Sequence, residues 1–338
     1  MTDYFRPLVQ IGPARPDTAV SLAGGWGWFT HAEVLSRRTP ARVVPAADIP
    51  ASVMARLTAP RPAMAGLTLD RPRIMGILNT TPDSFSDGGQ HNAVPDALRV
   101  AQEMVTAGAD ILDIGGESTR PGADFVPVSE EITRTAPVIA ALRGAGLHTP
   151  ISIDTRKAAV AEAAVSAGAN LVNDVSGFTF DPALGPLCQK LALPVCVMHA
   201  QGDPATMHLD PQYDNVLLDV FDALERQISM LEASGIPRGA ILADPGIGFG
   251  KTQDHNLALL ARLSLFHALG TPILLGVSRK RFIGTIGNAP QAQDRAPGSI
   301  AVALAGLGQG VQMIRVHDVD DTRQAVALWH AAYFGSIL

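Results

Sequence analysis

Short apolar runs alternate with longer amphipathic segments from about residue 73 to the C-terminus. The runs are rich in Ile, Val and Leu and are nearly continuous in hydrophobicity, which is typical of parallel strands that are buried on both faces. Eight runs predict strands, at Ile74–Leu78, Ile111–Ile114, Ile151–Ile153, Leu171–Val172, Val195–Met198, Ile241–Ala243, Ile273–Leu275 and Met313–Val316.

The segments after these runs have the spacing of helices, and several of them end at glycine, where a left-handed cap is favourable. Eight strand-then-helix units over about 265 residues predict an α/β fold, a (β/α)8 TIM barrel. An open doubly wound sheet is the alternative, because strand order cannot be read from the pattern. The predicted helices are Val94–Ala107, Ser129–Arg143, Lys157–Ala167, Pro182–Leu191, Asn215–Ser234, Asp254–Leu269, Ser299–Gly308 and Asp321–Tyr333.

The chain before the first predicted strand lacks this rhythm. It has a Gly/Trp cluster at Gly24–Trp28, a Pro/Arg stretch at Pro60–Arg73, and no long periodic helix. Short strands near Val43 and Val44 are consistent with its pattern. We therefore expect an N-terminal extension or small subdomain over residues 1–71, of unknown role, and a barrel domain over residues 72–338.

Composition narrows the class of protein. The 338 residues are 47% hydrophobic and only 17% charged, and the net charge of −6 argues against general binding to nucleic acid. The two cysteines, Cys188 and Cys196, lie in apolar runs and are expected to be buried thiols of a reducing compartment. Because we find neither a signal peptide nor a membrane-spanning run, we expect a soluble, cytoplasmic protein.

Hydrogen-bonding residues follow every predicted strand. In a barrel of this kind the chemistry takes place at the carboxyl ends of the strands. A single Asp there is more often a helix cap, but Arg and Lys cannot cap a helix start, so the whole set favours a site. In strand order the residues are Asn79; Glu117, Thr119 and Arg120; Asp154; Asn173 and Asp174; His199; Asp244; Ser278, Arg279 and Lys280; and Arg315 and His317.

The types of these side chains indicate what they bind. Asp154, Asn173 and Asp244 supply acceptors and one amide, which suit a flat heterocycle with N–H donors and a carbonyl group. Lys280 adds a donor for such a ring. Arg315 can stack on a ring or donate to a phosphate.

The first and last strands are neighbours in a closed barrel. Asn79 and His317, which follow these two strands, therefore suit a pyrophosphate with its Mg²⁺. The glycine-rich segments 80–89 and 115–122 are long for strand–helix connections and are expected to be lids over the site, the second of which brings Arg120 near an anion.

Two other kinds of site are disfavoured. The segment Gly246–Thr252 resembles a nucleotide phosphate loop, but three residues rather than four separate its Gly246 and Gly250, so we expect a tight loop behind Asp244. His199 and His208 lack the spacing of a zinc motif. We expect His199 to be satisfied by its neighbours and assign it no role.

Several segments together closely resemble the dihydropteroate synthase family, in order and in spacing. The resemblance covers the chain from about Arg73 onward and is specific as a set. Its carriers are Ile74-Met-Gly-Ile-Leu-Asn79-Thr-Thr-Pro-Asp-Ser-Phe-Ser-Asp-Gly-Gly89, Asp113-Ile-Gly-Gly-Glu-Ser-Thr-Arg-Pro-Gly122, Ile153-Asp-Thr-Arg-Lys157, Asn173-Asp-Val-Ser-Gly177, Asp244-Pro-Gly-Ile-Gly-Phe-Gly-Lys251, Ser278-Arg-Lys280 and Arg315-Val-His-Asp318.

The resemblance implies condensation of 6-hydroxymethyl-7,8-dihydropterin pyrophosphate with p-aminobenzoate, Mg²⁺ as cofactor, sensitivity to sulfonamides and a homodimer. It implies four groups of residues. The pterin site is Asp154, Asn173, Asp244, Phe249, Lys280 and Arg315; the pyrophosphate and p-aminobenzoate sites are Asn79, Phe85, Thr119, Arg120, Pro121, Ser278 and His317; the metal ligand is Asn79; and catalysis falls to Asp87, Arg120, Lys280 and Arg315.

Departures from the family pattern are small. Thr80 stands where Val is usual and is expected to be a packing position. Pro297 falls in the first turn of a predicted helix, where proline is tolerated.

Two alternatives remain open. A pterin-binding methyltransferase module would share Asp154, Asn173 and Asp244 but lack the lid motifs, and a non-catalytic synthase paralogue would have lost site residues.

Overall fold

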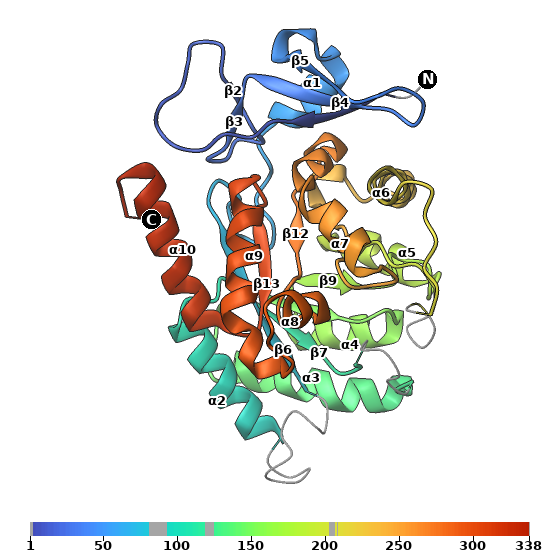
Figure 1. Ribbon diagram of the computed structural model, residues 1–338. Coiled ribbons are helices and arrows are strands. Elements are labelled where there is room, and N and C mark those ends of the chain that lie inside the picture. Colours follow the sequence, from blue (N-terminus) through green and yellow to red (C-terminus); the bar gives the residue numbers. More distant parts are fainter. Residues whose placement is uncertain (1–2, 81–92, 119–124, 203–206, 208, 338) are drawn as a thin grey trace.

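Each predicted apolar run is a strand of one barrel. The computed structural model describes residues 3–80, 93–118, 125–202, 207 and 209–337, and its strands and helices are drawn in Figure 1. The barrel strands are β6 (Arg73–Asn79), β7 (Ile111–Gly115), β8 (Ile151–Asp154), β9 (Leu171–Asp174), β10 (Val195–Met198), β11 (Ile241–Asp244), β12 (Leu274–Leu275) and β13 (Met313–Val316).

The sheet closes on itself. Its strand order is β11-β10-β9-β8-β7-β6-β13-β12, and each neighbouring pair with a full ladder is parallel. A parallel bridge between Ala243 of β11 and Ile273, just before β12, joins the two ends of this order. The fold is therefore a TIM barrel, and the open doubly wound sheet is excluded.

Helices surround the barrel near the predicted positions, and one further helix, α8 (Arg281–Ile286), was not predicted. Among the described residues, no helix is both long and apolar enough to span a bilayer. Pro297 lies in the first turn of α9, as predicted. The helices of the barrel domain are α2 (Ala93–Thr106), α3 (Val128–Gly144), α4 (Ala158–Ala167), α5 (Leu184–Lys190), α6 (Val216–Ala233), α7 (Gln253–Leu260), α8 (Arg281–Ile286), α9 (Ala296–Gly308) and α10 (Val319–Phe334), with short 3-10 helices η3 (Arg238–Ala240), η4 (Leu263–Leu269) and η5 (Ala292–Arg295).

The prediction of a single helix over Asp254–Leu269 is wrong. The segment Asp254–Leu269 is two elements, because the chain leaves helical geometry at Arg262 (φ −133°, ψ 32°) and continues as η4. Every residue of η4 is buried, since the N-terminal subdomain covers the face that is turned away from the barrel. A segment that is buried all round has no polar stripe, so its pattern does not reveal the break.

Residues 3–72, which we call the N-terminal subdomain, have sheets apart from that of the barrel. Strands β1 (Tyr4–Pro7), β4 (His31–Leu35) and β5 (Arg42–Pro45) pair antiparallel, and β2 (Val20–Ser21) pairs with β3 (Trp28–Phe29). The strand predicted near Val43 is β5. The short helix α1 (Ala51–Thr58), which follows η1 (Ala46–Asp48), was not predicted. In Figure 1 this subdomain (blue) covers one end of the barrel.

The segment after α1 seals that end of the barrel. Met64 and Leu69 are 1% and 2% exposed and pack among residues that point into the barrel from the first half of its strands. We call this cluster the apolar plug; it consists of Met64, Leu69, Met75, Ile111, Leu171, Cys196, Leu242, Leu274 and Met313. Cys196 is thus a buried thiol, as is Cys188 on the buried side of α5.

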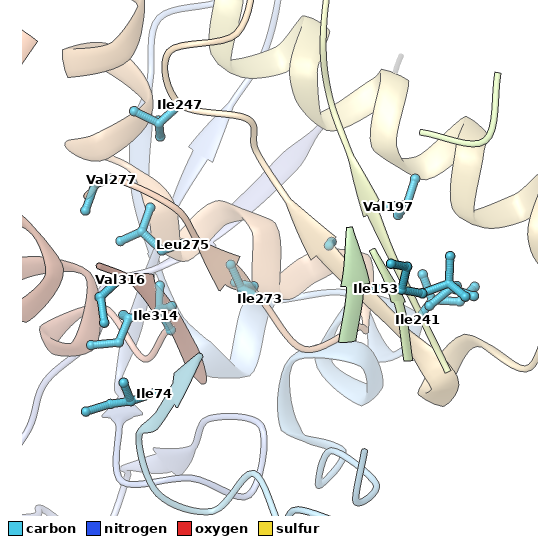
Figure 2. Packing of buried hydrophobic residues seen from close by; sticks show 14 of the residues in the cluster. Ile74, Ile153, Val197, Ile241, Ile247, Ile273, Leu275, Val277, Ile314 and Val316 are labelled. Carbon is cyan, nitrogen blue, oxygen red and sulfur yellow. The ribbon is translucent and has the colours of Figure 1, made fainter. Parts of the chain in front are cut away.

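Alternation along the strands separates the two sides of the barrel wall. Figure 2 shows part of the outer layer, including Ile74, Ile314 and Val316, which belong to the large core cluster shared with the surrounding helices. The neighbouring residues Met75 and Met313 face the interior instead. Because successive side chains of a strand point to opposite sides, the residue two positions after a plug residue also faces the interior.

Charges join the N-terminal subdomain to α6. Arg37 pairs with Asp219 and Asp222 at 2.6 and 2.8 Å, and Arg56 pairs with Glu225 at 3.1 Å. The hydroxyl of Tyr4 also donates to Asp222. Residues 1–71 contain eight arginines and five acidic residues, and these pairs account for two of the arginines.

Candidate active site

Arg315 lies at the centre of a polar cluster above the apolar plug. It follows Met313 by two residues on β13 and therefore points into the barrel. Its Nε lies 2.6 Å from Oδ2 of Asp113, and its Nη2 lies 2.8 Å from Oδ2 of Asp154. Asn173 donates from Nδ2 to the same oxygen of Asp113, at 3.2 Å. One guanidinium thus joins three strands of the barrel.

Asp113 is a site residue that sequence reasoning missed. It is fully buried, and its Oδ1 has no hydrogen-bond partner among the described residues. It lies within β7 rather than after it, so a search confined to the ends of strands passes over it. Its position two residues after Ile111 of the plug was the available signal, because both must face the interior.

The electrostatics of this cluster follow from burial. Desolvation raises the pKa of Asp154 to about 7; the positive charge of Arg315 opposes this shift, and the negative charge of Asp113 adds to it. Although burial acts to lower the pKa of Arg315, the two carboxylates raise it overall, so the guanidinium stays charged. A carboxyl group that gains a proton near neutral pH can donate as well as accept a hydrogen bond.

Asp244 and Lys280 form the adjoining wall. Asp244 ends β11 and is 6% exposed, and its Oδ1 accepts from the backbone N–H of Gly246 at 2.7 Å. Burial raises its pKa against the opposing effects of that N–H and of Lys280. The ammonium of Lys280 lies 4.1 Å from the ring centroid of Phe249, a cation–π contact. The structure therefore brings these three predicted residues together.

Asn79 lies next to Asp154 across a glycine. Gly115 of β7 is in register with both residues, and a Cβ atom at Gly115 would lie 3.8 Å from Oδ1 of Asn79 and 3.5 Å from Cβ of Asp154. The absence of a side chain at Gly115 leaves room between them. Thr80 is buried and donates to the carbonyl of Gly115 at 3.1 Å, which fits the expected packing role.

Ser278 and His317 are paired at the neighbouring strand ends. The Ser278 hydroxyl oxygen lies 2.9 Å from Nδ1 of His317 and accepts from its backbone N–H at 3.1 Å. Arg279, between Ser278 and Lys280, forms an ion pair with Asp318 instead. We call the whole cluster the polar mouth; it consists of Asn79, Asp113, Asp154, Asn173, Asp244, Phe249, Ser278, Lys280, Arg315 and His317.

Glu117 has a structural role and does not belong to the polar mouth. Its carboxylate accepts two hydrogen bonds from Arg156, at 3.1 and 3.2 Å, and pairs with buried Lys157 at 3.2 Å. It also accepts from the backbone N–H of Val126 at 3.1 Å. Burial acts to raise the pKa of Glu117, but these partners lower it overall. Glu117 thus ties the strand end at 115–118 to residues beyond 124.

Five predicted site residues cannot be placed. Phe85, Asp87, Thr119, Arg120 and Pro121 lie outside the described residues, so their expected roles stay predictions.

The loop after β11 packs tightly, as expected for a loop that is not a phosphate site. Gly246 has φ +68°, and a Cβ atom there would lie 1.9 Å from the carbonyl oxygen of His199. Gly250 has φ +60°, and its Cβ would lie 2.3 Å from the carbonyl oxygen of Gln201. The loop lies directly against the end of β10, and the carbonyl oxygens occupy the space that a side chain at either glycine would need.

A metal site made of protein alone is not present in the part of the chain that the structure describes, where no three His, Cys, Asp or Glu side chains cluster suitably. Mg²⁺ commonly keeps waters and takes one or two protein oxygens together with substrate phosphates. The side-chain oxygen of Asn79 beside Gly115 meets that requirement.

Comparisons with known proteins agree on one family. Residues 75–317 match the model of a family described as pterin binding enzyme. The dihydropteroate synthase of Synechocystis is 44% identical over 257 residues, which are 75% of this chain and 89% of the relative.

Solved structures give the same result. A Xanthomonas albilineans dihydropteroate synthase with 4-aminobenzoic acid is 44% identical with a TM-score of 0.74, and covers 79% of this chain and 96% of that one. The Yersinia pestis dihydropteroate synthase in a sulfonamide drug complex is 45% identical with a TM-score of 0.75. The match covers 80% of this chain and 98% of that one. The family match begins after the N-terminal subdomain.

Proposed function

The chain belongs to the dihydropteroate synthase family, and we infer that its barrel condenses 6-hydroxymethyl-7,8-dihydropterin pyrophosphate with p-aminobenzoate. The products are 7,8-dihydropteroate and pyrophosphate, so the protein is a transferase of folate biosynthesis. The observation that carries this function is the polar mouth, in which Asp154, Asn173 and Asp244 lie with Arg315 and Lys280 at the carboxyl ends of the strands.

The pterin ring is assigned to the buried part of the polar mouth. Asp154 and Asp244 accept from its N–H groups, and Asn173 both donates and accepts. A flat ring that is removed from water needs such matched partners, because each unpaired polar group costs about 1–3 kcal/mol. Phe249 and the face of Arg315 enclose the ring, and Lys280 donates to a ring nitrogen or carbonyl.

The pyrophosphate is assigned to the neighbouring strand ends. Arg315, His317 and Ser278 donate to its oxygens, and the Ser278–His317 contact orients the imidazole toward that side. Asn79 would hold Mg²⁺, which neutralises part of the charge on the leaving group.

The lid segments are assigned to the amine. Phe85, Thr119, Arg120 and Pro121 would form the p-aminobenzoate site, with Arg120 pairing with its carboxylate, and Asp87 would lie near the reacting carbon. Sulfonamides resemble p-aminobenzoate and should compete there; the Yersinia pestis relative was solved as a sulfonamide drug complex.

In the reaction, the bond between the pterin methylene and pyrophosphate breaks, and a carbon–nitrogen bond to the aniline nitrogen forms, after which that nitrogen loses a proton. We propose that pyrophosphate leaves first, because an electron-rich pterin supports a cationic methylene. Arg315 and His317 then act by stabilising negative charge on the leaving group. Pyrophosphate release in the absence of amine would support this order, and its strict dependence on amine would exclude it.

The function is tested by mixing the protein with dihydropterin pyrophosphate, Mg²⁺ and p-aminobenzoate. We expect one pyrophosphate released for each dihydropteroate formed, and inhibition by a sulfonamide that added p-aminobenzoate relieves. Failure to form either product would overturn the proposal, and methyl transfer to a corrinoid protein would favour the methyltransferase alternative.

We further propose that the protein is a cytoplasmic homodimer. Two buried free thiols support a reducing compartment. Light scattering coupled to gel filtration gives the mass, and a monomeric mass across micromolar concentrations would exclude the dimer.

A further inference from the structure

Lys251 is a buried cation outside the polar mouth. It is 4% exposed, and its Nζ donates to the backbone carbonyls of Gly246 (2.9 Å), Phe249 (3.0 Å) and His199 (3.2 Å). Its fourth neighbour is Nδ1 of His199, at 3.0 Å. A lysine that is removed from water at high cost, and bonded to three carbonyls of two segments, holds those segments together.

His199 is suited to be its partner. Burial, with the nearby charge of Lys251, lowers the pKa of His199 to about 3, so the imidazole is neutral at physiological pH. While Lys251 is charged, its ammonium only donates, so the lone pair of the neutral imidazole lies on Nδ1 and its proton on Nε2. Burial also lowers the pKa of Lys251, to about 7, with Asp244 opposing the shift.

The loop that Lys251 holds carries part of the pterin wall. Gly246 donates its N–H to Asp244, while the Phe249 ring lies against Lys280. A second tie acts on the same loop, since Tyr213 donates from its hydroxyl to the carbonyl of Gly250 at 2.8 Å. The backbone between β11 and α7 is therefore held at two places, by Lys251 and by Tyr213.

We propose that Lys251 and His199 are positioning residues that set the pterin wall by fixing the loop 245–250 on the end of β10. The proposal rests on the pterin-binding role proposed above for Asp244, Phe249 and Lys280. Lys251 and His199 act through the loop and need no contact with substrate.

The test replaces each partner and measures pterin binding apart from stability. In Lys251→Met the side chain keeps its approximate shape but leaves the three carbonyls without their donor. His199→Leu removes the acceptor, whereas His199→Asn returns an oxygen near the place of Nδ1. His267 supplies the matched control: it is also buried and neutral, with its pKa lowered to about 3 by burial, but it lies in η4 at the opposite end of the barrel.

We expect Lys251→Met and His199→Leu to raise the KM for dihydropterin pyrophosphate, and its dissociation constant measured without amine, by about tenfold or more, because the loop that positions Asp244 and Phe249 loses its tie to the end of β10. His199→Asn should restore both to within about threefold on the same scale. His267→Leu should lower the melting temperature and leave both constants unchanged.

Equal constants for Lys251→Met and the unsubstituted protein would overturn the proposal. If Lys251→Met does not fold, the two His199 variants provide the test. Equal pterin binding by His199→Leu and His199→Asn would then overturn the proposal. If the unsubstituted protein binds dihydropterin pyrophosphate but forms no dihydropteroate, the proposed function fails, and the binding comparison still tests the positioning role. If it binds no pterin at all, both fail.

Discussion

The two ends of the barrel interior are built from the same strands and differ in almost everything else. At one end, the apolar plug fills the space with Met and Leu side chains such as Met64 and Leu69. Further along the strands, the polar mouth places fully buried Asp113 against Asp154 and Arg315, which are partly exposed. The plug is stabilised by removing apolar surface from water, whereas the mouth holds desolvated charges that stabilise one another only as a set.

Stability and function therefore depend on different ends of the barrel. A change in the plug should alter the free energy of unfolding and leave catalysis alone, and a change in the mouth should do more to binding than to folding. The N-terminal subdomain should contribute to stability and not to catalysis, because it supplies Met64 and Leu69 to the plug and arginines to the outside of α6.

The largest effect on stability is expected from Leu69→Ala. Leu69 is 2% exposed, and truncating a buried leucine costs about 2–5 kcal/mol, which includes the cavity left behind. Urea unfolding should show this loss, while kcat and the KM for both substrates stay unchanged under folding conditions. A loss of activity without a loss of stability would contradict the separation of the two ends.

Asp113→Asn should affect substrate binding more than stability. Weakening the charged contact to Arg315 is expected to raise the KM for dihydropterin pyrophosphate by about tenfold to a hundredfold, since such hydrogen bonds contribute about 1.5–3 kcal/mol. The matched control is Asp110→Asn. Asp110 also pairs with arginines, Arg73 and Arg323, but lies at the plug end, and its replacement should affect stability alone. Equal KM values for the two variants would contradict this prediction.

A smaller effect is expected from the pH dependence of Asp154. Its folded pKa of about 7 lies above its ordinary value of 3.8, so the folded protein binds the extra proton between these values. Ionised Asp154 therefore destabilises the fold above pH 7, and this cost fades as the pH falls toward 4. The variant Asp154→Asn lacks this ionisable group and should unfold with a higher free energy than the unsubstituted protein. This difference should grow as the pH rises from 5 to 7, by up to about 1.4 kcal/mol per pH unit. A difference that is constant over this range would contradict the raised pKa.

Much of the barrel could be predicted from the sequence because its strands are short, continuous apolar runs. Polar residues that follow such a run, including Asn79, Asp244 and Lys280, can be recognised because the sequence changes there from apolar to polar. Asp113 does not, since it lies inside a run and only its register with Ile111 places it in the interior. The separation of α7 from η4 is hidden for another reason, namely burial of η4 by a subdomain that is distant in sequence.

Apart from β5, the strands of the N-terminal subdomain could not be predicted, nor could the support of the loop after β11. The strands of this subdomain are two to five residues long, too short for a clear alternation of polar and apolar positions. Lys251 contacts both Nδ1 and the backbone carbonyl of His199, 52 positions earlier in the chain, and no side-chain pattern records a carbonyl acceptor.

Calorimetric titration with dihydropterin pyrophosphate, in the absence of amine, tests most directly that the polar mouth is the pterin site. We expect Asp154→Ala and Lys280→Ala to bind at least about tenfold more weakly than the unsubstituted protein, because each loses a buried hydrogen-bonding partner of the ring. Their circular dichroism spectra should stay unchanged. Unaltered affinity in both variants, with the fold intact, would contradict the assignment of the pterin to this end of the barrel.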